Sequence, residues 1–381
     1  MKKVSKLIAL LLVAVLAFSL AGCGKTNEPA PTTATEAPKA DDSSKSFLVG
    51  TNCWGAGVPV LDYQLAYRTG SLETFGCTVT SASDDFTADK ELQNGQNFVS
   101  AGVNGICFQG GAPNVIPIIA DLCKENKIPF TIDSQVGGDD ILNPIAADNE
   151  FYLGAVEADY IFQGEQLAQA AYDDGCRKAI IVGGNIGDVN MDKCQQGFTQ
   201  VFEKLGGKVV GVGRCTDQSE CATKVEDLLS ANRDTDCIYM MVGDYVAGTR
   251  SATQNLGVSP NLYVSCTDAD SAQLIKEGVI TCGNDGFLLS CMVAPTILMN
   301  YLLYGNKFLD ENGHAKHYLV PGFIINKDNA DKYIEVFYTP GSYPVSNALL
   351  KNLVRADITE KEFKDTVYSL DLATLAEWQK K

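Results

Sequence analysis

Polar side chains recur where short apolar runs of this sequence end. The residues in these positions are Asn52, Trp54, Gln109, Asp133, Ser134, Asp244, Asp268 and Asn284. Carboxylates and amides hydrogen bond to vicinal hydroxyl groups, and an aromatic ring packs against the C–H face of a sugar ring. Asp and Asn are also common at helix N-caps and turns, which is the simpler explanation of each residue taken alone. Their recurrence at strand ends favours a shared site for a neutral polyol.

The elements that would position these side chains begin at Phe47. Strands are predicted at 47–52, 78–83, 103–108, 128–133, 178–183, 208–212, 236–242 and 261–265, with helices at 61–75, 89–101, 113–126, 191–205 and 225–231. Strands separated by helices of this length are typical of right-handed βαβ crossovers and parallel sheets. Such sheets bind ligands at the carboxyl ends of their strands. The sequence therefore predicts an α/β fold with the polar residues gathered at those ends.

Composition excludes several other classes of function. The chain has 381 residues, 45% of them hydrophobic, which suits two domains. Its formal net charge of −17 repels nucleic acid. With His314 and His317 as the only histidines, a hydrolase triad or zinc site is not expected, and no cofactor, metal or catalytic residue is predicted. Thirteen cysteines are too few for a disulfide scaffold; Cys215 and Cys221 could form a local disulfide or remain free thiols.

The first 22 residues are typical of an export signal. Three lysines precede an apolar run at 7–20 that is short for a membrane span. The run ends in Leu20-Ala21-Gly22-Cys23, which resembles the bacterial lipobox, in which the cysteine takes diacylglycerol. We therefore expect a signal peptide at 1–22, a lipidated Cys23 and a Pro/Ser/Thr-rich disordered tether at 23–46. The protein would be extracytoplasmic and attached to the cell membrane by acyl chains.

Short motifs follow one another along the chain at 101–106 (AGVNGI), 127–133 (KIPFTID), 145–149 (IAADN), and later at 197–198, 239–244, 263–268, 276–281 and 326–329. These segments resemble successive signatures of the ribose/galactose-type (type I) periplasmic binding proteins of ABC importers. The resemblance implies two similar Rossmann-like lobes with parallel sheets, joined by a three-strand hinge and closing on a small ligand, usually a sugar. It places lobe 1 at 47–148 plus 284–320, lobe 2 at 149–283 plus 321–340, and a helical extension at 341–381.

The resemblance also implies site residues. Asp133, Asp268 and Asn284 match positions that contact sugar hydroxyls in that family, and Trp54 lies in the loop that carries stacking aromatics. Asn52, Ser134, Asp188, Asn190 and Asp244 complete the predicted ligand-binding set.

This sequence also departs from the family pattern. The expected arginine is replaced by Asp192 or Cys194, Gly243 replaces an asparagine, and Ser134 stands where ribose binders often carry arginine. Bidentate donors are therefore missing, which disfavours ribose and leaves an acidic pocket for another aldose, an aminosugar or a polyol.

Together these features predict a monomeric solute-binding lipoprotein, not an enzyme, that delivers a monosaccharide or polyol to the transmembrane subunits of an ABC permease. A sensor that presents the same ligand to a membrane receptor or kinase would share the fold and the site. An exported sugar-processing enzyme would need two carboxylates flanking a scissile bond, a role open to Asp133 and Asp268. In the extension, 359–362 (TEKE) predicts a capping box. We expect the helix that it begins to pack across a lobe or the hinge, with contact to a partner as the alternative.

Overall fold

The computed structural model describes residues 46–339 and 343–381. The predicted signal peptide, Cys23 and all but the last residue of the predicted tether lie outside the described residues, so those predictions stay untested.

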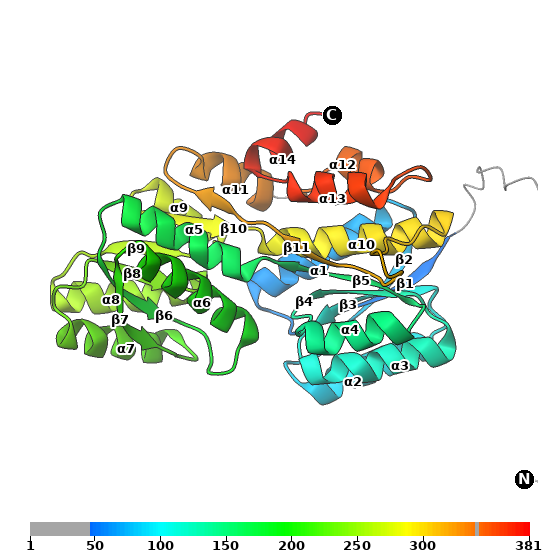
Figure 1. Ribbon diagram of the computed structural model, residues 1–381, viewed down its shortest axis with the longest axis horizontal. Helices are drawn as coiled ribbons and strands as arrows, with labels where there is room; N and C mark the ends of the chain where they lie inside the picture. Colours follow the sequence, from blue (N-terminus) through cyan, green and yellow to red (C-terminus); the bar gives the residue numbers. More distant parts are fainter. Residues whose placement is uncertain (1–45, 340–342) are drawn as a thin grey trace, which may run out of the picture. The chain divides into compact units, whose positions relative to one another are not determined.

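Two six-stranded sheets organise the chain, one in each lobe (Figure 1). The first sheet has the order β11-β5-β4-β3-β1-β2, and all its neighbouring strands are parallel. Its strands are β1 (Leu48–Cys53), β2 (Thr78–Ser83), β3 (Gly105–Gly110), β4 (Phe130–Ser134), β5 (Tyr152–Ala158) and β11 (His317–Val320). The helices between them are α1 (Pro59–Glu73), α2 (Ala88–Ser100), the 3₁₀ turn Pro113–Val115, α3 (Ile116–Asn126) and α4 (Asp139–Asp148).

The second sheet has the order β12-β10-β9-β8-β6-β7, parallel except for the antiparallel pair β10 and β12. Its strands are β6 (Lys178–Val182), β7 (Lys208–Gly213), β8 (Cys237–Met240), β9 (Asn261–Val264), β10 (Cys282–Asp285) and β12 (Phe323–Ile325). Its helices are α5 (Tyr160–Asp173), α6 (Val189–Lys204), α7 (Gln218–Ala231), the 3₁₀ turn Gly243–Tyr245, α8 (Val246–Leu256), α9 (Ala269–Lys276) and α11 (Ala330–Tyr338). The predicted α/β class with two parallel-dominated sheets is confirmed.

The chain passes between the two sheets three times, and two of the predicted lobe boundaries are displaced. The prediction ended the first segment of lobe 1 at Asp148, but β5 pairs with β4 and β11, so the first crossing follows Ala158. The prediction returned to lobe 1 at Asn284, which instead lies inside β10 of the second sheet. The third crossing lies between Val320 and Phe323. Strand pairing across the sheet, which is not local in sequence, decides these boundaries.

Helix α10 (Phe287–Tyr304) is the one helix in the described part of the chain that is long and apolar enough to cross a membrane. It is instead a core helix, because 72% of its apolar window is buried within the protein. It lies on the first lobe against α1, β3, β4 and β5. A helix that is apolar on all sides is expected to be buried on all sides.

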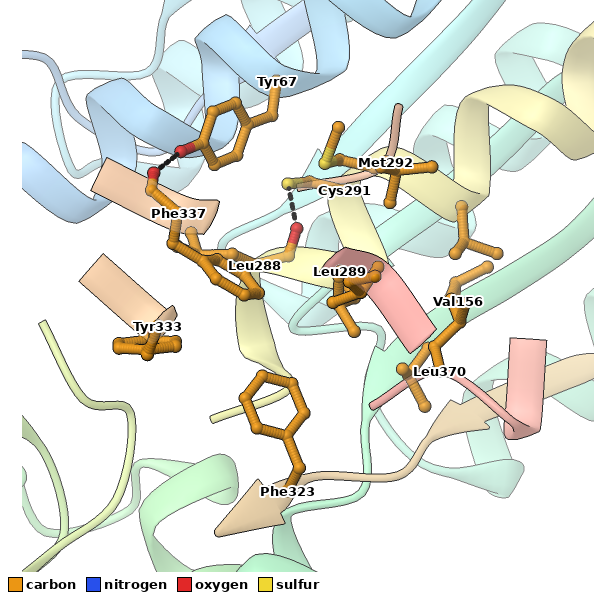
Figure 2. Packing of buried hydrophobic residues seen from close by; sticks show 14 of the residues in the cluster. Tyr67, Val156, Leu288, Leu289, Cys291, Met292, Phe323, Tyr333, Phe337 and Leu370 are labelled. Atoms are coloured by element: carbon orange, nitrogen blue, oxygen red, sulfur yellow. Dashed lines mark hydrogen bonds between the residues drawn. The ribbon is translucent and has the colours of Figure 1, made fainter. Parts of the chain in front are cut away.

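The C-terminal helices α12 (Asn347–Leu353), α13 (Glu360–Tyr368) and α14 (Leu372–Trp378) pack beside α10, β11 and α11. Figure 2 shows Leu370 and Phe337 gathered with side chains of α10 in one core, where the Tyr67 hydroxyl donates to the Phe337 carbonyl. In α13, Phe363 stacks on Phe308 at 4.4 Å between ring centroids. The capping box at Thr359 and Glu362 is confirmed, and so is packing of this helix on the protein.

Candidate functional site

A cavity of about 190 Å³ lies where both lobes contribute side chains. An engineered cavity of about 150 Å³ holds benzene, so this one has room for a single six-membered ring. The first lobe contributes Val58, Pro59, Val60 and Gln135. The other lining residues are Tyr160, Asp188, Asn190, Met191, Val242, Gly243, Asp244, Cys266, Thr267, Asp268, Asp285, Phe287, Leu288 and Tyr338. Several of them follow β6, β8, β9 and β10, so the cavity lies at the carboxyl ends of the second sheet, as such sheets predict.

Asp188 and Asn190 reach the cavity from the start of α6. Asp188 is the N-cap of this helix, and its Oδ1 accepts from the backbone amides of Asn190 (3.0 Å) and Met191 (3.1 Å). Its Oδ2 has no partner among the described residues. Asn190 is 5% exposed, and its side-chain amide forms no hydrogen bond with any residue that the structure describes. Both predicted residues therefore carry unused polar atoms at the cavity.

Asp244 and Asp268 lie side by side at the cavity. Asp268 is the N-cap of α9, and its Oδ1 accepts from the Ser271 amide at 2.6 Å. Its Oδ2 packs on the backbone next to Asp244, since a Cβ atom on Gly243 would lie 2.7 Å from it. Desolvation and the negative charge of Asp268 raise the pKa of Asp244. Two carboxylates without a cation between them thus face this part of the cavity.

Sequence reasoning missed several lining residues. Tyr160, the first residue of α5, is 1% exposed, and its ring lies 6.3 Å from that of Phe287. Asp285 is buried and accepts from the Tyr333 hydroxyl (2.7 Å) and the Phe287 amide (3.0 Å); its burial raises its pKa to about 6. The Tyr338 hydroxyl donates to the Thr267 carbonyl at 3.0 Å. Asp285 alone had a local signal, since it follows the predicted Asn284 at the end of a strand.

Asp133 and Ser134 do not line the cavity, because they belong to a buried polar cluster in the first lobe. Arg68 of α1 donates to Asp133 through Nε (2.7 Å) and Nη2 (2.5 Å), and both side chains are fully buried. The Ser134 hydroxyl donates to Asp133 (3.0 Å) and accepts from Gln64 (3.1 Å). The hydrogen-bond donor to the Asp133 carboxylate is therefore the Arg68 guanidinium and not a sugar hydroxyl. The arginine that the family pattern expects is missing from its position in the sequence, and no arginine is among the residues that line the cavity. Arg68 is buried and bound to Asp133.

Asn52 and Asn284 are also buried away from the cavity. The Asn52 amide donates to Asp84 (2.7 Å) and to the Gln109 carbonyl (2.8 Å), and its oxygen accepts from the Gln109 amide (2.7 Å). The Asn284 amide donates to the Gln163 carbonyl at 2.7 Å, where β10 meets α5. Each of these residues joins elements of its own lobe, although the Asn284 side-chain oxygen has no hydrogen-bond partner among the described residues.

Trp54 is half-buried and packs within the first lobe. Its ring meets Phe86 edge to face at 6.3 Å, and it covers the backbone of Gly111, where a side chain would collide with the indole. It is not among the residues that line the cavity. The aromatic rings at the cavity are those of Tyr160, Phe287 and Tyr338.

One group in the described part of the chain has metal-ligand spacing. Ligand atoms of Cys176, Asp236 and Cys237 lie within 4.8 Å of one another. Both Asp236 oxygens already accept from the backbone amides of Arg177 (2.7 Å) and Lys178 (2.9 Å), so this carboxylate serves as a loop brace. The group lies at the amino ends of β6 and β8, opposite the cavity. All twelve cysteines among the described residues are free thiols, Cys215 and Cys221 included.

Solved structures share this fold at low sequence identity. A Mycobacterium smegmatis protein in complex with β-D-fucofuranose has a TM-score of 0.63 and 16% identity, covering 76% of this chain and 94% of its own. A periplasmic ribose ABC transporter protein from Conexibacter woesei has a TM-score of 0.65 and 17% identity, covering 77% and 96%. A carbohydrate transporter protein from Acidothermus cellulolyticus, in complex with myo-inositol, has a TM-score of 0.64 and 15% identity, covering 76% and 98%. No curated protein matches the sequence.

A family model described as a periplasmic binding protein domain matches residues 71–289, more than half of the chain. The match spans both sheets and includes every cavity element from the start of α5 to the start of α10. The chain therefore belongs to the periplasmic binding protein domain family, whose members bind substrates and are not enzymes.

Proposed function

We propose that the protein captures one monosaccharide or polyol in the cavity between its lobes and delivers it, as an extracytoplasmic lipoprotein, to an ABC permease. The observation that carries this proposal is the cavity itself, ring-sized and lined by both lobes at the strand ends. Asp188, Asn190, Asp244 and Asp268 are the proposed hydrogen-bonding residues. Neighbours of the same fold were solved with a furanose and with myo-inositol, which supports this ligand class.

A thermal-shift screen against aldoses, ketoses and polyols tests ligand capture. A ligand that binds only the folded protein raises its stability by RT ln(1 + [L]/Kd). We expect at least one single-ring or open-chain polyhydroxylated compound to raise the melting temperature. Calorimetry on Asp244→Ala should then show weaker binding. A panel without any such ligand would refute the proposed class.

Lipid attachment and delivery need separate experiments. Cys23→Ala should abolish diacylglycerol labelling and release the protein from the membrane. Uptake of the identified ligand should require both this protein and a permease. Capture without any effect on uptake would favour a sensor that presents the ligand to a receptor.

A further inference from the structure

All the ionisable acidic and basic side chains that line the cavity are acidic. Four carboxylates line it, those of Asp188, Asp244, Asp268 and Asp285, and no lysine, arginine or histidine does so among the described residues. Asp285 is already satisfied by Tyr333 and the Phe287 amide. The other three retain carboxylate oxygens that no described group binds. The lining therefore offers an excess of charged acceptors to whatever enters.

Neighbouring cations do not neutralise these acceptors. Lys193 of α6 pairs with Glu157 at 2.7 Å, and Arg214 pairs with Asp192 at 2.8 Å. Arg250 lines an outer groove that shares Asp244 and Asp268 with the cavity, yet it forms no ion pair in the described chain. No protein cation therefore balances the repulsion between the carboxylates of Asp244 and Asp268, which contributes to the raised pKa of Asp244. A positively charged ligand would reduce this repulsion.

Two neutral polar groups on buried residues are also available to a ligand in the cavity. The Tyr160 hydroxyl and the Asn190 amide have no described hydrogen-bond partner, although their residues are only 1% and 5% exposed. Since both residues line the cavity, a bound molecule can hydrogen bond to the two groups. The rings of Tyr160 and Phe287 add aromatic surface, which attracts both C–H faces and cations.

We infer that the ligand is a protonated amine that also carries hydroxyl groups, such as an aminosugar or an amino polyol, with its ammonium group between Asp244 and Asp268. This inference rests on the proposed function and narrows its ligand class. A neutral polyol satisfies Tyr160 and Asn190 but leaves the two carboxylates unneutralised. An ammonium group supplies three donors and one positive charge, which pair with both carboxylates at once.

Matched pairs of compounds that differ only in one amine test this inference. The probes are D-glucose with D-glucosamine, D-galactose with D-galactosamine, and D-glucitol with 1-amino-1-deoxy-D-glucitol, each measured by calorimetry at pH 7. We expect the amine of at least one pair to bind about tenfold or more tightly than its neutral partner. Asp244→Asn keeps the shape of the side chain and should reduce that preference to about twofold or less. Asp227→Asn, an exposed position on α7, is the matched control and should retain the preference.

The outcomes separate this inference from the proposed function. Neutral members that bind as tightly as their amines would overturn the inference and leave the proposed function standing. A preference for amines that Asp244→Asn does not change would overturn the placement of the ammonium group. Binding by no member of any pair would overturn the inference, and the wider screen of neutral compounds then decides the proposed function by itself.

Discussion

Replacing Asp133 by alanine removes the carboxylate that neutralises the buried Arg68 guanidinium. Two charged hydrogen bonds, of 2.7 and 2.5 Å, are lost, and the guanidinium keeps only its bond from Nη1 to the Asn52 carbonyl at 3.0 Å. Both side chains are 0% exposed, so water does not replace the lost partner. Removing one member of a buried ion pair costs about 3–5 kcal/mol. That is a large share of the roughly 5–15 kcal/mol by which a typical protein is stable.

Urea denaturation of wild type and Asp133→Ala, followed by circular dichroism, measures this effect. The unfolding midpoint of the variant should fall clearly, with an unchanged slope. Asp148→Ala is the matched control in the same lobe, because its pair with Lys124 is exposed and such pairs contribute little. The double variant Arg68→Met with Asp133→Leu should recover most of the loss, since apolar replacement of a whole buried pair is often nearly neutral.

The opposite pattern would refute this reasoning. If Asp133→Ala unfolds at the wild-type midpoint but no longer binds the ligand, Asp133 contacts ligand hydroxyls, as the family resemblance implies. Burial and the bond to Arg68 would then describe a state that the ligand rearranges.

Three further variants test one cavity residue, Asp268, and two first-lobe residues outside the cavity, Glu91 and Trp54. Asp268→Ala removes both a cavity carboxylate and the N-cap of α9. It should weaken ligand binding and also destabilise the protein by about 0.5–2 kcal/mol. Equal stability of Asp268→Ala and Asp268→Asn in urea would contradict the capping role. Glu91 is fully buried, and its burial raises its pKa to about 8. The protonated side chain therefore contributes fully to the free energy of unfolding below about pH 4.5, and this contribution is lost as pH rises through 8. Glu91→Gln should therefore flatten the decline in the urea midpoint between pH 5 and pH 9, and an unchanged decline would exclude Glu91 as its source. Trp54→Phe should leave calorimetric ligand affinity within about twofold, whereas a tenfold loss would show that the indole reaches the ligand.

Local sequence patterns were enough to place most elements. The strand at 78–83 coincides with β2, and the helix at 89–101 is α2 shifted by one residue. Apolar runs, glycine stops and capping residues act over a few positions, so they are visible in the sequence itself. Length alone did not decide which strands were predicted. β5, interrupted by Gly154 and Glu157, was predicted neither as a strand nor as part of the first lobe.

The sequence predicted only part of the site, because its patterns report on a few neighbouring positions and not on contacts between distant segments. Asp244 and Asp268 follow strands whose carboxyl ends meet at the cavity, and the strand-end rule pointed to them. Asp188 and Asn190, which also line the cavity, were predicted only from the family resemblance. Asp133 obeys the same rule, yet Arg68, which lies 65 positions away on α1, occupies its carboxylate.

The sequence by itself therefore determined the α/β class, the family resemblance and the acidic character of the strand ends. Only the tertiary structure decided which carboxylates stay unpaired, which aromatic rings reach the cavity, and where the chain crosses between sheets. Burial and hydrogen-bond partners depend on contacts between distant segments, and the identity of one residue and its near neighbours does not specify them.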